Sequence, residues 1–283
     1  MNLVSKIKTL ATNPKMLSAY VRWLSAKIVL RRPPRLDLDT GAHLGEWVSF
    51  SEYWSFQNVM PEIERLCVQR CLAANGDEMA IAFDIGANVG AFTCLMGSFG
   101  HTVHAFEPIP ETFCRLKNNV KSNGLLGRAN LNCLAVGKEQ GLVTFQTEEF
   151  GAATNRMIAP GGGEINSSTS TQVVAVTSLD DYCRSQNIGR IDFVKLDVEG
   201  MEPYVLQGAK TLLQERRIAA ILIEICPVNL HAVGLSPADL WCEFESARYF
   251  PYALKQDGSP GERLSLAHLE AMSLDNVLLL PDA

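Results

Sequence analysis

The sequence predicts an α/β protein built on a doubly wound, mostly parallel sheet. From Met79 onward, short apolar runs bounded by turn residues alternate with helical stretches, which is typical of strand–helix–strand units. Several runs, such as 221–223, are apolar at consecutive positions, as expected for strands that helices cover on both faces. With 283 residues, of which 47% are hydrophobic, the chain can bury a core of this size.

The expected elements follow from these runs and from their boundary residues. The expected strands are 80–84, 102–107, 129–134, 191–197, 219–225, 249–254 and 276–280, and the expected helices are 61–74, 91–98, 110–122, 202–214 and 236–247. The segment 139–178 instead predicts short antiparallel strands, 142–145 and 172–176. They flank a glycine- and serine-rich loop at 151–170, which is either a mobile lid or a surface insertion.

Charge separates the first 36 residues from the rest of the chain. They hold eight bases and no acid, which leaves 17 bases against 31 acids and a net charge of −14 for the remainder. Nucleic-acid binding is not expected of an acidic body, because phosphate groups need a cationic face. A cationic or neutral ligand suits it better.

Residues 1–75 are expected to form a helical N-terminal extension or cap, and residues 76–283 the main domain. An apolar stripe with neighbouring bases predicts one or two helices over 1–32. These helices either pack on their own chain or on a second subunit, giving a homo-oligomer, or lie on an anionic membrane surface. We favour packing, and we also expect packing rather than a ligand cap for the aromatic segment 43–60, which includes Trp47 and Trp54.

The eight cysteines predict a reducing compartment. None forms a CxxC pair, and most lie in apolar runs, so we expect buried free thiols and no zinc site. No stretch approaches 18 uncharged apolar residues, and no secretory signal pattern opens the chain. A cytoplasmic protein is therefore expected.

The first candidate site follows the strand that begins at Ala80. Asp84 ends this strand, and Gly86, Asn88 and Gly90 lie in the turn to the next helix. Gly86 allows a tight turn and Gly90 close helix packing. A dinucleotide site would carry a glycine where Asn88 stands, which argues against NAD or FAD. A carboxylate at Asp84 would repel phosphate and favour a ligand with an amino group.

Acidic residues also end the other strands of the predicted sheet. Glu107, followed by Pro108, lies 23 residues after Asp84, where a carboxylate accepts hydrogen bonds from ribose hydroxyls. Asp197 and Glu199 follow a later strand, and Glu224 ends its neighbour. These acids could hold a hydroxyl, act as a base, or bind a divalent cation. Glu202 suits the first turn of a helix.

Taken together, these motifs resemble the FkbM family of S-adenosylmethionine-dependent methyltransferases. The resemblance rests on FDIGANVGAFT, HAFEPIPETFCRLKNNV, VTSLDDYC, IDFVKLDVEGMEPYVLQGA and ILIEI, and covers roughly residues 79–230. It implies a class I methyltransferase (Rossmann-like) fold with a seven-stranded sheet whose last strand is antiparallel. It also implies O-methylation of a hydroxyl on a sugar or natural-product acceptor.

The resemblance assigns roles to individual residues. The expected cofactor-binding residues are Asp84, Gly86, Asn88, Gly90, Glu107, Pro108, Ala135 and Asp197. Many class I methyltransferases place an acid or amide beside the adenine, whereas this chain reads Cys133-Leu134-Ala135-Val136. The adenine contact at Ala135 is therefore expected to be apolar and through the backbone.

Asp197, Glu199 and His231 are the expected catalytic residues. A neutral alcohol needs a base, and Mg²⁺ or another divalent cation held by Asp197 and Glu224 would lower its pKa. Two alternatives stay open: a noncatalytic binding or scaffold protein on the same fold, and an NAD-dependent oxidoreductase.

Overall fold

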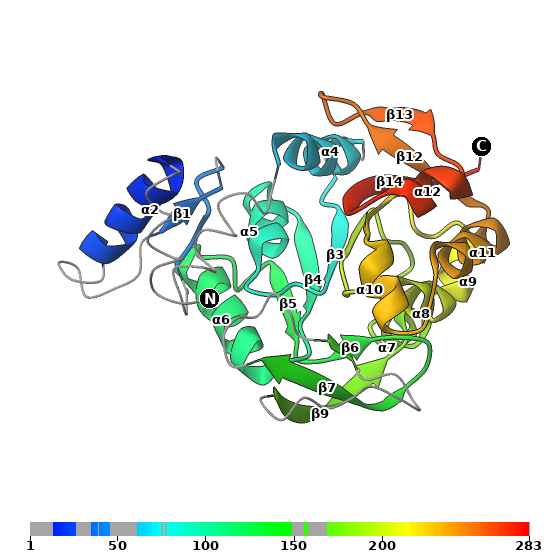
Figure 1. Cartoon of the computed structure of the whole chain (residues 1–283), viewed down its shortest axis with the longest axis horizontal. Helices are drawn as coiled ribbons and strands as arrows, with labels where there is room; N and C mark the ends of the chain where they lie inside the picture. The colour runs from blue at the N-terminus through cyan, green and yellow to red at the C-terminus, as the bar shows by residue number, and fades with distance from the viewer. Residues whose placement is uncertain are drawn as a thin grey trace.

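An eight-stranded sheet forms the centre of the molecule (Figure 1). The computed structural model describes residues 14–26, 35–38, 40–45, 61–74, 76, 78–148, 156–157 and 169–282. The strand order is β13-β12-β14-β11-β10-β3-β4-β5, and the pairs among β11, β10, β3, β4 and β5 are parallel. The predicted doubly wound α/β class is confirmed.

The sheet has one strand more than the seven expected. Its strands are β3 (Ile81–Ile85), β4 (Thr102–Phe106), β5 (Ala129–Asn132), β10 (Phe193–Leu196), β11 (Ile221–Ile225), β12 (Tyr249–Leu254), β13 (Pro260–Arg263) and β14 (Asp275–Pro281). The additional strand, β13, pairs antiparallel with β12 at the edge of the sheet. The last strand, β14, lies antiparallel between β11 and β12, as the resemblance implied.

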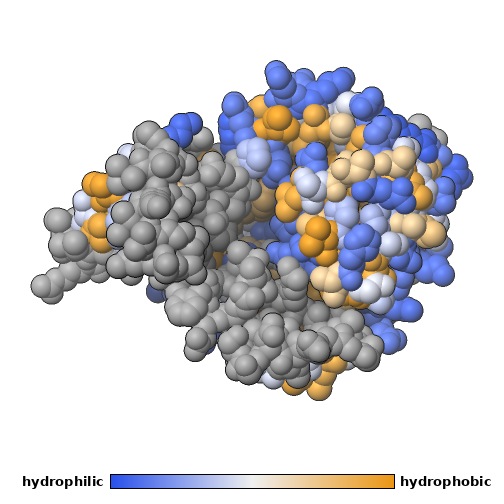
Figure 2. All heavy atoms as spheres, viewed as in Figure 1, coloured by the Kyte–Doolittle hydropathy of each residue, from blue (hydrophilic) through white to orange (hydrophobic). Residues whose placement is uncertain are grey.

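Helices cover both faces of the sheet. They are α4 (Glu62–Ala73), α5 (Ala91–Ser98), α6 (Pro110–Ser122), α7 (Leu179–Ser185), α8 (Glu202–Gln207), α9 (Lys210–Gln214), α10 (Pro227–Ala232), α11 (Pro237–Ala247) and α12 (Leu266–Ala271). Helices α4 and α5 bury Val68 and Leu95 in one cluster with Leu222 of β11. Helices α7, α8, α9 and α11 pack in another cluster with Ile223 of the same strand. On the face in Figure 2, most described residues at the outer rim are hydrophilic.

A second, four-stranded sheet interrupts the alternation, as predicted for 139–178. Its order is β6-β9-β7-β8, from β6 (Ala135–Val136), β7 (Gly141–Glu148), β8 (Arg156–Met157) and β9 (Thr169–Thr177). The pair β7–β9 is antiparallel over its whole length. Apart from β8 and the start of β9, the loop 151–170 lies outside the described residues, so its role as a lid or an insertion stays a prediction.

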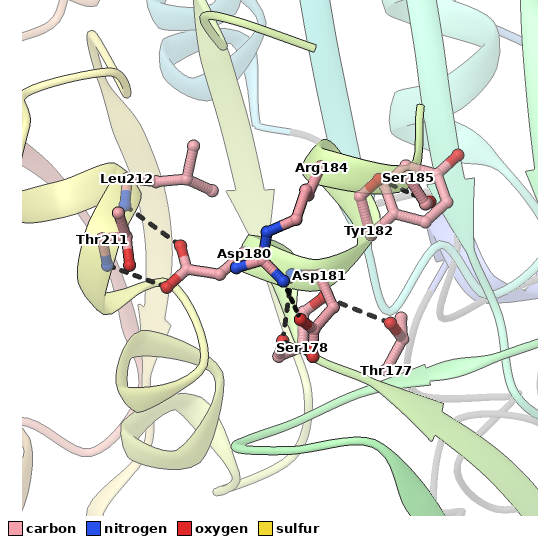
Figure 3. A network of polar contacts seen from close by, with 9 residues as sticks. All are labelled: Thr177, Ser178, Asp180, Asp181, Tyr182, Arg184, Ser185, Thr211 and Leu212. Carbon is pink, nitrogen blue, oxygen red and sulfur yellow. Dashed lines mark hydrogen bonds and ion pairs between the residues drawn. The ribbon is translucent and has the colours of Figure 1, made fainter. Parts of the chain in front are cut away.

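The helix expected over 202–214 is two short helices, α8 and α9. The carbonyl oxygen of Gly137 lies 2.0 Å from the position that a Cβ of Gly208 would take, so only glycine lets the end of α8 approach the segment after β6 this closely. The Asp180 carboxylate accepts hydrogen bonds from the backbone N–H groups of Thr211 and Leu212, at 2.8 and 3.0 Å (Figure 3). This cap starts a new helix, and periodicity alone did not reveal it.

The described part of the N-terminal extension contacts the body beside α6. It contains α2 (Pro14–Ser25), β1 (Leu36–Asp37) and β2 (His43–Leu44). Buried Ala19 and Leu44 share a cluster with Leu116 of α6, and the His43 N–H donates to the side chain of Asn123 at 2.8 Å. The aromatic residues 47–56 lie outside the described residues. None of the described helices has the length and apolar character needed to cross a membrane.

Candidate active site

One large cavity lies at the carboxyl ends of the central parallel strands. Its volume is about 890 Å³, and its walls come from the ends of β3, β4, β10 and β11, from the connection between β6 and β7, and from the start of α4. The chain order reverses between β3 and β10, and ligands of doubly wound sheets bind at this switch point.

The turn after β3 forms the floor of the cavity. Gly86 has a φ of +83°, and a Cβ there would lie 1.8 Å from the backbone oxygen of Asp197, so only glycine lets β3 and β10 approach this closely. Asp84 is buried and accepts a hydrogen bond from the Thr93 hydroxyl at 2.5 Å. Burial raises the pKa of Asp84 to about 6. Gly90 lies behind the wall, where its missing Cβ leaves room for Leu116 of α6.

Glu107 closes one end of the cavity. Its two carboxyl oxygens accept hydrogen bonds from the backbone N–H groups of Asn88 (3.0 Å) and Ile109 (2.9 Å). Each oxygen keeps a second lone pair for a ligand hydroxyl. Burial raises the pKa of Glu107 to about 7, although the two hydrogen bonds act in the opposite direction and lower it. Pro108 and Ala135 also line this end, so all the expected cofactor residues except Gly90 lie around one cavity.

The other end of the cavity contains a buried lysine that the sequence analysis missed. Lys195 of β10 is 1% exposed. Its Nζ donates to Asn276 Oδ1 at 2.9 Å and to Asp197 Oδ2 at 3.3 Å, and it lies over the ring of Phe92. The sequence did contain a signal for this residue, because a lysine inside the apolar run 193–196 is unusual for a buried strand. Its partner Asn276 comes from β14, 81 positions away, and no local pattern connects the two residues.

Strand register explains how these polar groups meet. Lys195 lies beside Asp84 of β3 and Leu222 of β11, and Glu224, two residues beyond Leu222, pairs with Asn276. Residues two apart on a strand share a face. These side chains therefore lie on the face that α4 and α5 cover, and at the carboxyl end of that face they form a polar cluster.

The cluster contains more acids than bases. Burial, and after it the negative charge of Asp197, raises the pKa of Glu224 to about 8. Burial lowers the pKa of Lys195, but the charges of Asp197, Glu224 and Glu64 outweigh it, so that this pKa lies above its ordinary value. The cavity therefore favours a ligand that brings positive charge.

The loop after β10 positions a further acid. Glu199 has a φ of +54°, and its carboxylate accepts a hydrogen bond from the side chain of Asn229 at 2.6 Å. Both residues line the cavity. Glu202 begins α8 as expected, and its carboxylate holds the loop by accepting from the N–H groups of Val198 and Gly200.

His231 is separate from these residues. It lies exposed on α10, and it is not among the residues that line the cavity. The structure therefore does not bring the expected histidine to the other candidate catalytic residues.

The pair Asp197 and Glu224 does not fit the expected divalent cation. Across the described residues, no group of three or more His, Cys, Asp or Glu side chains could hold a metal ion. The Lys195 ammonium occupies one side of Asp197 at 3.3 Å, whereas Mg²⁺ demands nearly octahedral oxygen coordination. No metal role is assigned to this pair.

Comparison with known proteins agrees with this geometry. The model of the Methyltransferase FkbM domain matches residues 84–251. A relative described as "Hexuronic acid methyltransferase AglP", from Haloferax volcanii, is 27% identical over 77% of this chain and 82% of its own length. A second, "31-O-demethyl-FK506 methyltransferase FkbM" from Streptomyces tacrolimicus, is 29% identical over 56% of this chain and 72% of its own length.

A solved structure, a "SAM Dependent Methyltransferase from Agrobacterium tumefaciens", is 9% identical, covers 89% of this chain and 71% of that one, and has a TM-score of 0.46, a likeness too weak to carry an argument.

The matched segment 84–251 is more than half of the chain and contains the turn after β3, Glu107, Lys195, Asp197 and Glu224. The chain belongs to the FkbM family of S-adenosylmethionine-dependent methyltransferases.

Proposed function

We propose that the protein is an O-methyltransferase that transfers a methyl group to a hydroxyl of a sugar or natural-product acceptor, such as a polyketide, peptide or glycoside. The observation that carries the proposal is a cavity with two chemically different ends. One end, around Glu107, suits a nucleoside, and the other holds Lys195, Asp197 and Glu224. The names of the two relatives, a hexuronic acid methyltransferase and a 31-O-demethyl-FK506 methyltransferase, support this substrate class.

The residues at the Glu107 end of the cavity (the donor end) fit S-adenosylmethionine. The carboxyl oxygens of Glu107 have lone pairs left for two ribose hydroxyls, and Gly86 removes the side chain that would obstruct the cavity floor. Buried Asp84 adds negative charge, which suits an amino group and repels phosphate. Asn88, Pro108 and apolar Ala135 complete this end. Asp197 borders both ends, because its backbone oxygen lies against Gly86 and its carboxylate contacts Lys195. The bound cofactor supplies a methyl group on a cationic sulfur.

In the proposed mechanism, three residues share the chemistry at the acceptor hydroxyl. The Glu224 carboxylate takes the hydroxyl proton, and its raised pKa makes it a stronger base than an ordinary carboxylate. The Lys195 ammonium stabilises the negative charge that develops on the oxygen. Asp197 holds Lys195 by a 3.3 Å hydrogen bond, and Glu199 orients Asn229 at the cavity wall. No step is assigned to His231 or to a metal ion.

The remaining proposals concern the context of the site. We propose that residues 1–75 cap the methyltransferase domain formed by residues 76–283, since α4 places Glu64 at the cavity. Assembly into a homo-oligomer through the extension, and a cytoplasmic location, stay predictions. All eight cysteines are free, although only Cys67, Cys94 and Cys183 are buried as expected; free thiols support a reducing compartment.

Calorimetry followed by a transfer assay tests the proposed function. The full chain should bind S-adenosylmethionine and not NAD. Labelled cofactor should then transfer its methyl group to members of a panel of uncharged glycosides, uronates and polyketide alcohols. Binding without transfer to any acceptor would favour the noncatalytic alternative, and absence of cofactor binding would contradict the whole proposal.

A further inference from the structure

Helix α4 brings a buried carboxyl group to the cavity from outside the family-matched segment. Glu64 is 7% exposed and lines the cavity. Its Oε1 accepts a hydrogen bond from Asn276 Nδ2 at 2.8 Å. Its Oε2 is buried and has no hydrogen-bond partner among the described residues. A buried carboxyl oxygen that lacks a partner costs stability, which points to a ligand that supplies one.

A structural role in α4 does not explain this carboxyl group. Acids in the first turn of a helix commonly cap it or interact favourably with the positive end of its dipole. The N-cap residue of α4, however, makes no side-chain capping hydrogen bond. The neighbouring Glu62 is exposed and pairs with Arg65 at 3.7 Å on the surface. Glu64 points the other way, toward Asn276 and the cavity.

Glu64 lies at the end of the cavity away from the nucleoside residues. Its partner Asn276 belongs to β14, which lies beyond β11 and β10 when the sheet is followed from β3. Gly86 and Glu107 follow β3 and β4, on the other side of β10. Asn276 also accepts the hydrogen bond from Lys195, so one chain of contacts links α4 to the proposed reacting centre.

We propose that Glu64 is an acceptor-binding residue whose Oε2 hydrogen-bonds a hydroxyl group of an uncharged acceptor. This inference rests on the proposed function, because it needs an acceptor at this end of the cavity. A hydroxyl both donates and accepts, so it pairs with a carboxylate or with a carboxylic acid. A carboxylate on the acceptor would instead meet the carboxyl groups of Glu64, Asp197 and Glu224. Lys195 is the one buried lysine or arginine in the described part of the chain.

A cysteine at position 64 tests this location without knowledge of the acceptor. Glu64→Cys is made in a Cys133→Ser, Cys226→Ser background, since Cys226 lines the cavity and exposed Cys133 contacts Pro108 at the donor end, and is treated with methyl methanethiosulfonate. The tryptic peptide 36–65 contains no native cysteine, so mass spectrometry reports the new thiol alone. Glu62→Cys is the exposed control. Ala135→Cys, made in a Cys133→Ser background, is the control at the donor end.

The proposal expects the thiol of the Glu64→Cys variant to react and the modified protein to bind S-adenosylmethionine within about threefold of the untreated protein. The adduct of the Ala135→Cys variant should weaken cofactor binding by more than about tenfold. An unreactive thiol at position 64 beside a reactive one at position 62 overturns the proposal. An adduct at position 64 that displaces the cofactor as the adduct at position 135 does also overturns it. Failure of the untreated protein to bind the cofactor would instead refute the proposed function.

The second measurement uses the acceptor found in the transfer assay. Glu64→Leu should raise the KM for the acceptor by about 10- to 100-fold, and Glu64→Gln, whose amide can still pair with a hydroxyl, should raise it less, while the KM for S-adenosylmethionine stays within about twofold. Glu62→Gln should behave as the natural protein does. An uncharged methyl hexoside should be a better acceptor than the matching hexuronide. Unchanged acceptor KM in folded variants, or a preference for the hexuronide, overturns the proposal.

Discussion

Replacing Lys195 by methionine should destabilise the protein in a strongly pH-dependent way. The methionine keeps most of the side-chain volume beside Phe92 but removes the ammonium that contacts Asp197 and Asn276. The charge of Lys195 also lowers the pKa values of Glu64, Asp84 and Glu224. Without it, no buried lysine or arginine among the described residues balances these carboxylates.

The magnitude follows from burial and from the pKa values. Removing one partner of a buried ion pair costs about 3–5 kcal/mol when the other charge persists. The carboxyl groups of Glu64 and Glu224 have pKa values of about 7 and 8, so at pH 5.5 they are mostly protonated and fewer carboxylates are left without a counter-charge. We expect a loss of about 3 kcal/mol in the free energy of unfolding at pH 8.5, and of about 1 kcal/mol at pH 5.5.

The sign follows from proton linkage. A carboxyl group whose folded-state pKa is raised binds more protons in the folded than in the unfolded state, between its ordinary pKa and the raised one. The free energy of unfolding therefore falls as the pH rises through that window, here from about 4.5 to about 8. Lys195→Met raises the folded-state pKa values further and makes this fall steeper.

Urea denaturation of both proteins at the two pH values measures the effect. Leu222→Met is the matched control, because Leu222 is fully buried and lies beside Lys195 in register. This swap should cost less than about 1.5 kcal/mol at both pH values. A Lys195→Met protein that loses equal stability at pH 5.5 and 8.5 would refute the electrostatic reasoning.

Four further outcomes are expected. Glu107→Ala should weaken S-adenosylmethionine binding by about 2–4 kcal/mol in calorimetry, because two ribose hydroxyls lose a charged acceptor; unchanged affinity in a folded variant contradicts the assignment. Gly86→Ala should lower the free energy of unfolding by at least about 2 kcal/mol through the contact with the Asp197 carbonyl, whereas Gly124→Ala, which has a similar positive φ and open space, should cost only about 1 kcal/mol. Excess chelator should leave methyl transfer intact, and loss of activity restored by Mg²⁺ would reinstate a metal at Asp197 and Glu224. Deletion of residues 1–36 should cause aggregation, since buried Ala19 packs beside Leu116; a monodisperse and fully active truncated protein would show that the packing is dispensable.

Local patterns were sufficient for most of the fold. Strand β12 and helices α5 and α6 have the predicted bounds, because the spacing of apolar residues and the turn residues at the boundaries encode them within a few positions. The turn from Asp84 to Gly90 was also evident from the sequence, since tight backbone approach selects glycine at specific positions. The edge strand β13 and the break between α8 and α9 escaped prediction. The break depends on the cap by Asp180, which lies 31 positions away from Thr211. Strand β13 pairs with its neighbour β12, but its sequence, PGER, has no apolar alternation that would predict a strand.

The candidate site also combines residues that the sequence identified with residues that only the tertiary structure brought together. Asp84, Glu107, Asp197 and Glu224 could be selected by sequence alone, because each ends a predicted strand and parallel strands bring their carboxyl ends to one edge. Only the tertiary structure joined Glu64, Lys195 and Asn276, which lie 131 and 81 positions apart along the chain. Their contacts depend on the order of strands in the sheet and on where α4 packs over it. His231 lies exposed on α10. Its short distance along the chain from Glu224 did not determine which face of that helix it occupies.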